Sequence, residues 1–239
     1  MKVGKKQKIA FWGLLGIFLT SCTTVSSTYK YYEPEPTHVD NELVIERPFS
    51  EVWDSLVKEL AKSFFVINNV EKESRIINVS FLTNNPEDYI DCGRSHRTSQ
   101  IDDESFNFNY PVAHSNSFII AAHWGTYKNL LAKYLINRKV SLEGRVNIYV
   151  APQDEGTVIT ANARYVFSSD GSGTIEYFNG VGTLVRSQPF PGSGPRTLSF
   201  NTNQPGSDDW GTPEEPIKVK CHSTGALEGQ ILRLVKPNP

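Results

Sequence analysis

Three cysteines are the residues of this 239-residue chain with the greatest capacity for covalent chemistry. They are Cys22, Cys92 and Cys221, and none of them belongs to a Cys-x-x-Cys pair of the kind that binds zinc. A thiol can be modified, oxidised to a disulfide or used as a nucleophile, and its surroundings select among these reactions. The compartment in which the chain folds therefore decides what its cysteines do.

The first 21 residues have the pattern of a removable signal peptide. Lysines 2, 5, 6 and 8 give a positive start, and the eleven residues from Ile9 to Leu19 carry no charge. A membrane-spanning helix needs about 20 apolar residues, whereas a signal-peptide core has about 7–15. The alternatives are an uncleaved signal anchor and an ordinary signal peptide followed by a chance cysteine.

The residues Leu19-Thr20-Ser21-Cys22 resemble the lipobox of bacterial lipoproteins, in which one aliphatic and two small residues precede the lipid-modified cysteine. The resemblance implies cleavage after residue 21 and lipid on Cys22. Two or more acyl chains hold a protein stably on a membrane. In enteric bacteria, an aspartate directly after the lipidated cysteine looks like a signal for retention in the inner membrane. This chain has Thr23 at that position. The expected location is therefore the periplasmic face of the outer membrane.

Export implies oxidising surroundings, in which Cys92 and Cys221 are expected to form a disulfide. Chain-entropy reasoning gives such a long-range bridge about 4–5 kcal/mol of stabilisation. Two free thiols or a metal site are the alternatives, but two cysteines alone make a poor metal site. The sequence predicts no metal and no other cofactor.

The charge of the mature chain argues against a nucleic-acid partner. Removal of residues 1–21 takes away four lysines and no acidic residue, so the net charge changes from −2 to −6. Phosphate binding needs a basic face. The expected partners are the membrane, through the lipid on Cys22, and a protein of the cell envelope, while the oligomeric state stays open.

No group of residues predicts an enzyme. The five histidines form no His-Glu-x-x-His or His-x-His pattern, and no Gly-x-Ser-x-Gly motif is present. The acidic residues between Asp88 and Glu104 lack the spacing of an EF-hand, which favours a solvated loop. The prediction is a non-enzymatic protein-binding or envelope-assembly module. Carriage of an apolar ligand between the sheet and the final helix is the alternative, and a hydrolase is the third reading.

Aromatic residues in irregular segments are the candidates for contact with a partner, because aromatic side chains are enriched in contact surfaces. The predicted contact patch consists of Trp124, Tyr127, Phe190 and Trp210. Trp53 lies instead on the apolar stripe of a predicted helix and is expected in the core.

The chain is expected to divide into the signal peptide (1–21), a lipidated flexible tether (22–41) and one domain (42–239). Small polar residues and Glu33-Pro34-Glu35-Pro36 without apolar periodicity predict the tether. The tyrosines at 29, 31 and 32 are the exception and could dock on the domain or lie at the lipid interface.

Apolar periodicity predicts the elements of this domain. The first are a strand over 42–47, a helix over 50–61, and strands over 64–70 and 77–81, with another strand around 106–110. Residues 127–135 have helical spacing, so a short helix is expected there, with a strand as the alternative. Three long strands begin at Val140, with a bulge at Glu143-Gly144 and turns at 152–156 and 170–173. A long loop (187–216) containing a short strand at 198–200 precedes a last strand (217–221) and a C-terminal helix.

This order resembles the helix-grip arrangement, in which a curved antiparallel sheet wraps a C-terminal helix. The expected fold is α+β, as a single domain. Residues 46–81 (ERPFSEVWDSLVKELAKSFFVINNVEKESRIINVSF) also resemble the repeated domains of BamC-type lipoproteins, which share the Pro-x-x-x-Val-Trp helix start and the hairpin after it. The chain differs from them in having room for one such domain and in its tail, Cys221-x-Ser-Thr-Gly-x-Leu-Glu.

Overall fold

The computed structural model describes residues 24–123, 130–192, 194–210 and 216–235. The structure is mainly antiparallel sheet, since 61% of it is strand against two short helices, and it forms a single domain. The C-terminal helix packs on the sheet, as expected. Strand is nevertheless the dominant element, to a greater degree than the α+β prediction implied.

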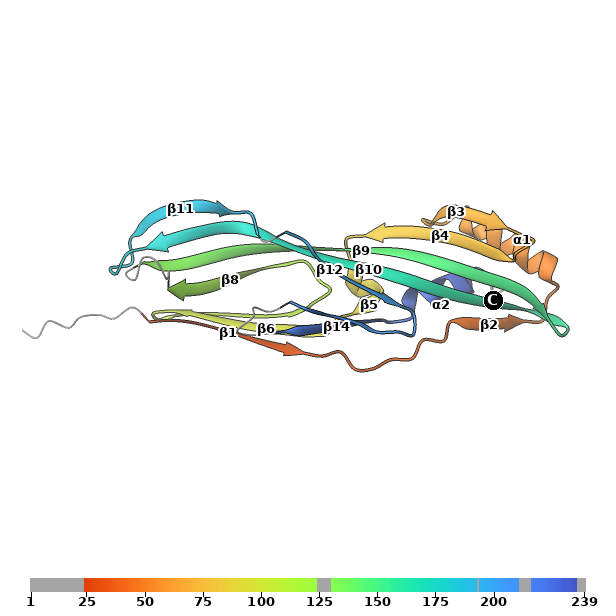
Figure 1. Ribbon diagram of the computed structural model, residues 1–239, viewed down its shortest axis with the longest axis horizontal. Coiled ribbons are helices and arrows are strands. Elements are labelled where there is room, and N and C mark those ends of the chain that lie inside the picture. The colour runs from red at the N-terminus through yellow and green to blue at the C-terminus, as the bar shows by residue number, and fades with distance from the viewer. Residues whose placement is uncertain (1–23, 124–129, 193, 211–215, 236–239) are drawn as a thin grey trace, which may run out of the picture.

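Two very long strands form the spine of the molecule. β9 (Leu131–Gln153) and β10 (Gly156–Phe178) have 23 residues each and pair without any shift of register. At roughly 3.3 Å per residue the hairpin is about 75 Å long. It runs the length of the elongated molecule in Figure 1.

The unbroken pairing gives the spine one continuous inner face. Side chains alternate along a strand, so the even-numbered residues of β9 and the odd-numbered residues of β10 point to the same side. The row from Ile159 to Phe167 was predicted to point inward, and Ile159, Tyr165 and Phe167 have no exposed surface. Two different layers cover this face, one at each end.

Helices cover the inner face at the end that carries the β9–β10 turn (Figure 1, right). Leu56 of α1 and Ile231 of α2 have no exposed surface and pack in one core with Phe167. The space between sheet and helices is therefore filled by side chains, and Trp53 lies in the core as predicted. The elements of this half are β2 (Glu42–Ile45), α1 (Phe49–Leu60), β3 (Val66–Glu71), β4 (Ile76–Thr83) and α2 (Ala226–Arg233).

A small second sheet lies opposite the spine at the other end (Figure 1, left). Serine hydroxyls join this sheet to the main chain of β8. Ser27 Oγ accepts from Ala121 N at 3.0 Å, and Ser99 Oγ donates to Ile119 O at 2.7 Å. The elements of this half are β1 (Val25–Tyr32), β6 (Arg94–Ile101) and β7 (Glu104–Pro111) in the small sheet, and β8 (Asn116–His123) and β11 (Leu184–Phe190) beside the spine.

The prediction of a flexible tether over 22–41 is wrong for Val25–Tyr32, which form β1 and pair with β6. The small polar residues of this segment are strand residues whose hydroxyls hydrogen-bond across the sheet. Tyr29 and Tyr31 dock on the domain, as one alternative had it, whereas Tyr32 is 45% exposed. The Tyr31 hydroxyl donates to Cys92 O at 3.1 Å and accepts from Lys220 N at 3.0 Å. Burial raises the pKa of Tyr31 to about 12.

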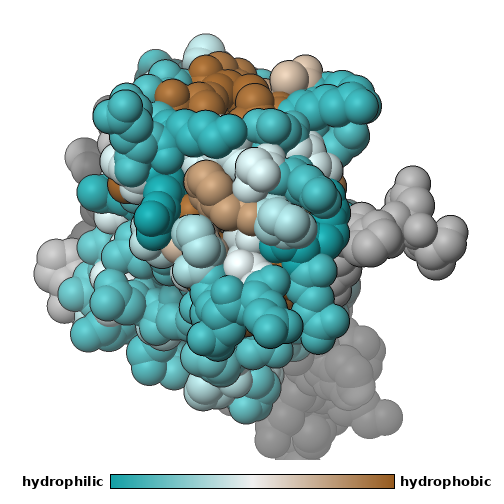
Figure 2. Space-filling view, turned by 90° about the vertical axis from the view of Figure 1, so that its right-hand side faces the viewer, coloured by the Kyte–Doolittle hydropathy of each residue, from teal (hydrophilic) through white to brown (hydrophobic). Residues whose placement is uncertain are grey.

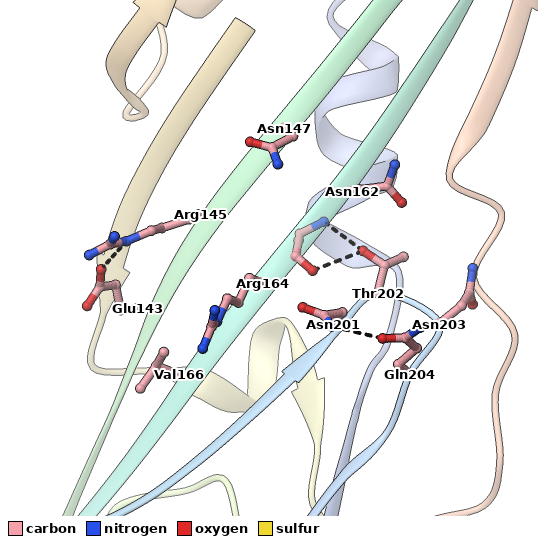
Figure 3. A pocket seen from close by; sticks show the side chains of 11 residues that line it. Glu143, Arg145, Asn147, Asn162, Arg164, Val166, Asn201, Thr202, Asn203 and Gln204 are labelled. Carbon is pink, nitrogen blue, oxygen red and sulfur yellow. Dashed lines mark hydrogen bonds and ion pairs between the residues drawn. The ribbon is translucent and has the colours of Figure 1, made fainter. Parts of the chain in front are cut away.

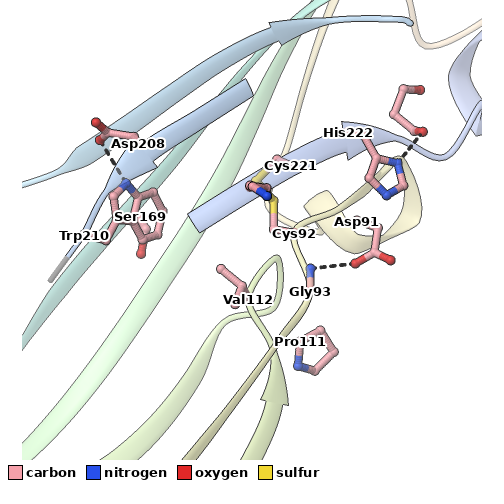
Figure 4. Close-up of a disulfide and its surroundings, with 12 residues drawn as sticks. Asp91, Cys92, Gly93, Pro111, Val112, Ser169, Asp208, Trp210, Cys221 and His222 are labelled. Carbon is pink, nitrogen blue, oxygen red and sulfur yellow. Dashed lines mark hydrogen bonds between the residues drawn. A yellow bond between two sulfur atoms is a disulfide. The ribbon is translucent and has the colours of Figure 1, made fainter. Parts of the chain in front are cut away.

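Short strands fill the middle of the molecule, where the predicted disulfide forms (Figure 4). Cys92 follows β5 and Cys221 lies in β14, and their sulfur atoms are bonded. The predicted loop over 187–216 contains the end of β11 and two strands, β12 and β13, of which β12 includes the short strand expected at 198–200. The elements here are a 3-10 helix (Pro86–Asp88), β5 (Ile90–Asp91), β12 (Arg196–Asn201), β13 (Gly206–Asp209) and β14 (Lys218–Ser223).

Two further expectations fail along the spine. The helix expected over 127–135 is wrong for its described part, because β9 begins at Leu131. Leu131 and Ala132 are both buried although they point to opposite faces, so the strand lacks its usual alternation. The expected turn at 170–173 is wrong because β10 continues through it. Gly173 serves close packing, since a Cβ there would lie 1.8 Å from Leu135 O.

Gly144 also marks close packing and not the expected bulge. Pairing of β9 with β10 and with β4 is regular on both sides of Glu143-Gly144. Gly144 pairs with Phe81, whose ring covers the glycine so closely that a Cβ would lie 2.0 Å from Cε1. The glycine is needed because the Phe81 ring occupies the space of a side chain.

Replacement of Gly144 by alanine is expected to lower the free energy of unfolding by roughly 1–3 kcal/mol, because the Phe81 ring must move. Gly171→Ala is the matched control on the same inner face, since its new Cβ would lie 3.6 Å from Ile136 Cγ2, an ordinary contact. Urea denaturation followed by circular dichroism measures both variants. Equal midpoints for the two would contradict this account of Gly144.

Removal of the disulfide by Cys92→Ala with Cys221→Ala is expected to lower the free energy of unfolding by about 2–5 kcal/mol, because the unfolded chain loses a long-range constraint. Thermal unfolding of the oxidised protein, the reduced protein and the double variant measures the effect. The reduced protein should match the variant. A variant as stable as the oxidised protein would show that the bridge does not stabilise the fold.

Candidate functional site

A cavity of about 470 Å³ lies between the small sheet and the inner face of the spine. This volume falls within the roughly 300–1,000 Å³ typical of ligand pockets. We call it the arginine–aromatic cavity, because six aromatic side chains line it together with arginines from three strands. Its main residues are Tyr29, Arg97, Tyr110, Phe118, Tyr134, Arg138, Phe190, Arg196 and Trp210.

Arg97 of β6 lies between two aromatic rings in this cavity. Its guanidinium carbon is 4.1 Å from the ring centre of Tyr29 and 4.7 Å from that of Phe118. Its Nε donates to the Tyr110 hydroxyl at 3.0 Å. Within the described ranges its two terminal nitrogens make no hydrogen bond. Arg97 is therefore held rigidly while most of its donors stay available to a ligand.

Arg138 of β9 is a charged residue in an otherwise apolar row of the inner face, between Ile136 and Val140. Its Nη2 donates to the main-chain oxygens of Val112 at 2.8 Å and His114 at 2.6 Å. Burial lowers the pKa of its guanidinium, because desolvation disfavours the charge. Arg138 therefore fixes the turn between β7 and β8, and its Nη2 donors are occupied by these hydrogen bonds.

The arginines give the cavity positive charge that no direct ion pair offsets. In the described part of the chain, Arg97, Arg138 and Arg196 form no ion pair with a carboxylate. A charge that is partly shielded from water acts more strongly than one on the open surface. The arrangement therefore fits a ligand group that combines a negative charge with an aromatic or aliphatic body.

Two residues of the predicted contact patch, Phe190 and Trp210, line this cavity. The Phe190 ring meets Tyr134 edge-on at 5.7 Å, and Trp210 stacks on Phe167 at 5.7 Å. The other two, Trp124 and Tyr127, lie outside the described residues, as does Cys22. The structure thus brings together one half of the patch and leaves the other half untested.

The arginines and Tyr29 were missed by the sequence reasoning. Tyr29 stood out as an exception within the predicted tether, which was the one signal available. Arg97 and Arg138 carried no signal, because pairing across strands decides that they meet. Burial also raises the pKa of Tyr29, whose hydroxyl is hydrogen-bonded to Ser95 Oγ at 2.8 Å.

A groove of about 750 Å³ on the opposite, exposed face of the spine has different chemistry (Figure 3). Amide side chains such as Asn147 and Asn162 line it, together with an ion pair between Arg145 and Glu143 at 2.8 Å. Arg164 points into it without a partner among the described residues. The groove can hydrogen-bond to polar groups, but it is open to water, so each such contact gains little.

The edge strand β3 offers a third surface. Val66 is 60% exposed and Val70 40%, and Ile76 of the neighbouring strand β4 is also exposed. Figure 2 shows a hydrophobic patch along the upper edge of this end, the side on which β3 lies in Figure 1. An open apolar edge strand is suited to contact with another protein chain.

Buried Glu228 belongs to the core and not to a site. It has no exposed surface and accepts hydrogen bonds from Tyr165 Oη at 2.9 Å, Thr202 Oγ1 at 2.8 Å and Ser223 Oγ at 3.1 Å. Burial, followed by the nearby Glu228 carboxylate, raises the pKa of Tyr165. This network fixes the start of α2 and accounts for the serine and glutamate of the tail motif.

The remaining polar residues are arranged as isolated groups. His114 forms an exposed ion pair with Glu87, and Nδ1 of His222 is hydrogen-bonded to Ser223 O. Asp102 and Asp103 form the exposed turn between β6 and β7, consistent with a solvated acidic loop. No cluster of three or more histidine, cysteine, aspartate or glutamate side chains able to hold a metal occurs in the described ranges.

Comparison of the chain with protein families, with curated proteins and with solved structures finds no match. Among the described residues no helix is long and apolar enough to cross a membrane.

Arg138→Met is expected to lower the free energy of unfolding by roughly 2–4 kcal/mol, because the main-chain oxygens of the β7–β8 turn lose their charged, partly buried hydrogen-bond donor. Arg97→Met keeps the stacking volume and should cost less than about 1 kcal/mol. Denaturant unfolding measures both variants. A larger loss for Arg138→Met would show that Arg138 supports the fold, whereas Arg97 is free to bind a ligand. Equal losses for both would contradict this division.

Proposed function

We propose that this protein is a lipid-anchored protein of the bacterial cell envelope that binds a partner protein without catalysing a reaction. Lipid on Cys22 holds it on the periplasmic face of the outer membrane. The observation that carries the binding role is the arginine–aromatic cavity, in which guanidinium groups without an ion-pair partner among the described residues lie among aromatic rings.

The chemistry of the cavity indicates the kind of segment that the partner presents. Arginine, tyrosine and tryptophan are the residues that most often dominate binding energy in protein interfaces. A carboxylate of the partner would meet the free nitrogens of Arg97, and an aromatic or aliphatic side chain beside it would lie against Phe190 and Trp210. Such a pairing gains strength because the cavity wall excludes water from much of it.

The fold is consistent with a helix-grip arrangement and with an assembly role like that of BamC-type proteins. The curved sheet packs on α2, and residues 46–81 have a helix followed by a hairpin, the order that the resemblance implied. Likeness of fold alone does not decide function, so the binding role rests on the cavity.

Carriage of an apolar ligand is the second candidate function. It is favoured by the cavity volume, which exceeds the roughly 300 Å³ that a small ligand needs. The ligand would lie between the two sheets and not beside α2, where Leu227 and Ile231 fill the space. The arginines would then require a ligand with an acidic head group.

Affinity capture of the intact lipoprotein from cross-linked membranes is expected to recover one envelope protein. Recovery should fall at least tenfold for Arg97→Met combined with Trp210→Ala, because the variant loses the free guanidinium and one aromatic wall. Arg145→Met in the exposed groove is the matched control and should capture as the natural sequence does.

Mass analysis of the same samples tests the anchor and the second candidate. A lipid mass on Cys22 is expected in every variant. Recovery of an acidic amphiphile alone, lost in the double variant, would favour the ligand-carrier function. Equal recovery of the protein partner by the double variant would exclude the cavity as its binding site.

A further inference from the structure

The chain is held firmly in place up to Thr24. Thr24 N donates to Asp102 Oδ1 at 3.0 Å, and Thr24 O accepts from Asp102 N at 2.9 Å. Cys22 is only two residues earlier, and covalent geometry keeps it within about 7 Å of Thr24. A lipid on Cys22 would therefore leave almost no slack between the membrane and this end of the molecule.

The same end carries the turn between β10 and β11. A hollow there is lined both by the β6–β7 turn, at Ile101 to Glu104, and by Phe178, Asn179 and Gly182. Figure 1 shows the start of β1 and the β10–β11 turn together at the left end, with the β10–β11 turn at the tip. The β6–β7 turn, to which Thr24 is hydrogen-bonded, and the β10–β11 turn therefore lie at the same end of the molecule.

The tip presents apolar side chains that the fold does not use. Val181 is 85% exposed, and Leu184 and Val185 are about half exposed at 49% and 51%. The turn is nevertheless rigid, since Asn179 Oδ1 accepts from Val181 N at 3.2 Å and from Thr183 N at 2.9 Å. Three exposed apolar side chains within five residues of one rigid turn form a local apolar surface, and exposed apolar surface of this kind marks interaction sites, membranes included.

We propose that this end of the protein is a membrane-contact surface, in which Val181 and Leu184 enter the interfacial region of the lipid bilayer beside the acyl chains on Cys22. This inference rests on the proposed lipidation of Cys22. The carboxylates of Asp103 and Glu104 lie at the same end and must stay hydrated, so insertion is shallow. The spine then projects away from the membrane, with its β9–β10 turn at the far end.

Site-directed spin labelling of the full lipidated chain in phosphatidylcholine vesicles tests the proposal. Nitroxides are placed at Val181→Cys and, as the matched control in an exposed turn at the opposite end, at Asp154→Cys. The label at position 181 should have an oxygen-to-nickel accessibility ratio several-fold higher than the label at 154. Val181→Asp with a label at Leu184→Cys should reduce the ratio at 184 relative to Leu184→Cys alone.

The outcomes separate the contact from the anchor. If the protein is lipidated and bound to vesicles but the labels at 181 and 154 are equally open to nickel, the contact is overturned and the anchor stands. If the natural chain carries no lipid, both are overturned. Protection at 181 without vesicles, with a doubled mass in solution, would identify a second copy of the chain as the occupant and overturn the proposal.

Discussion

The uninterrupted pairing of β9 with β10 is the constraint on which the rest of the structure depends. A bulge anywhere along the hairpin would turn the side chains beyond it to the opposite face. Because none occurs, one inner face extends from the β9–β10 turn to the tip at β11. The helices and the small sheet cover the two ends of this face, and both halves share a single frame.

The glycines of the spine keep this pairing regular. Gly144 leaves room for the Phe81 ring, and Gly173 allows close approach to the Leu135 carbonyl. Neither position makes a turn or a bulge, which are the usual reasons for glycine in a strand pattern. Long strands with intact register therefore depend on the absence of side chains at a few crowded positions.

Arg138 shows how the same inner face becomes a binding surface. Burial of a charge is costly unless hydrogen bonds compensate for lost water. Main-chain oxygens of the β7–β8 turn supply those bonds. Because these oxygens carry no full charge, the guanidinium is hydrogen-bonded but keeps its positive charge. Arg97 adds a second positive charge on the facing sheet, and aromatic rings line the cavity between the two arginines. The cavity thus differs from the filled core at the helical end because a few polar residues, such as Arg138, take the place of apolar ones on the inner face.

The sequence by itself determined the local elements and the chemistry of the cysteines. The apolar stripe of α1, the β3–β4 hairpin, the inward row of β10 and the pairing of Cys92 with Cys221 followed from periodicity and from the expected compartment. These features depend on neighbours in the chain or on cysteine count. Only the tertiary structure decided that Val25–Tyr32 form a strand, that residues 170–173 continue one, and that Arg97 meets Phe118. Residues 170–173 (Asp-Gly-Ser-Gly) have little preference of their own for a strand. For Val25–Tyr32, the partner strand β6 that fixes the segment lies far away in the sequence.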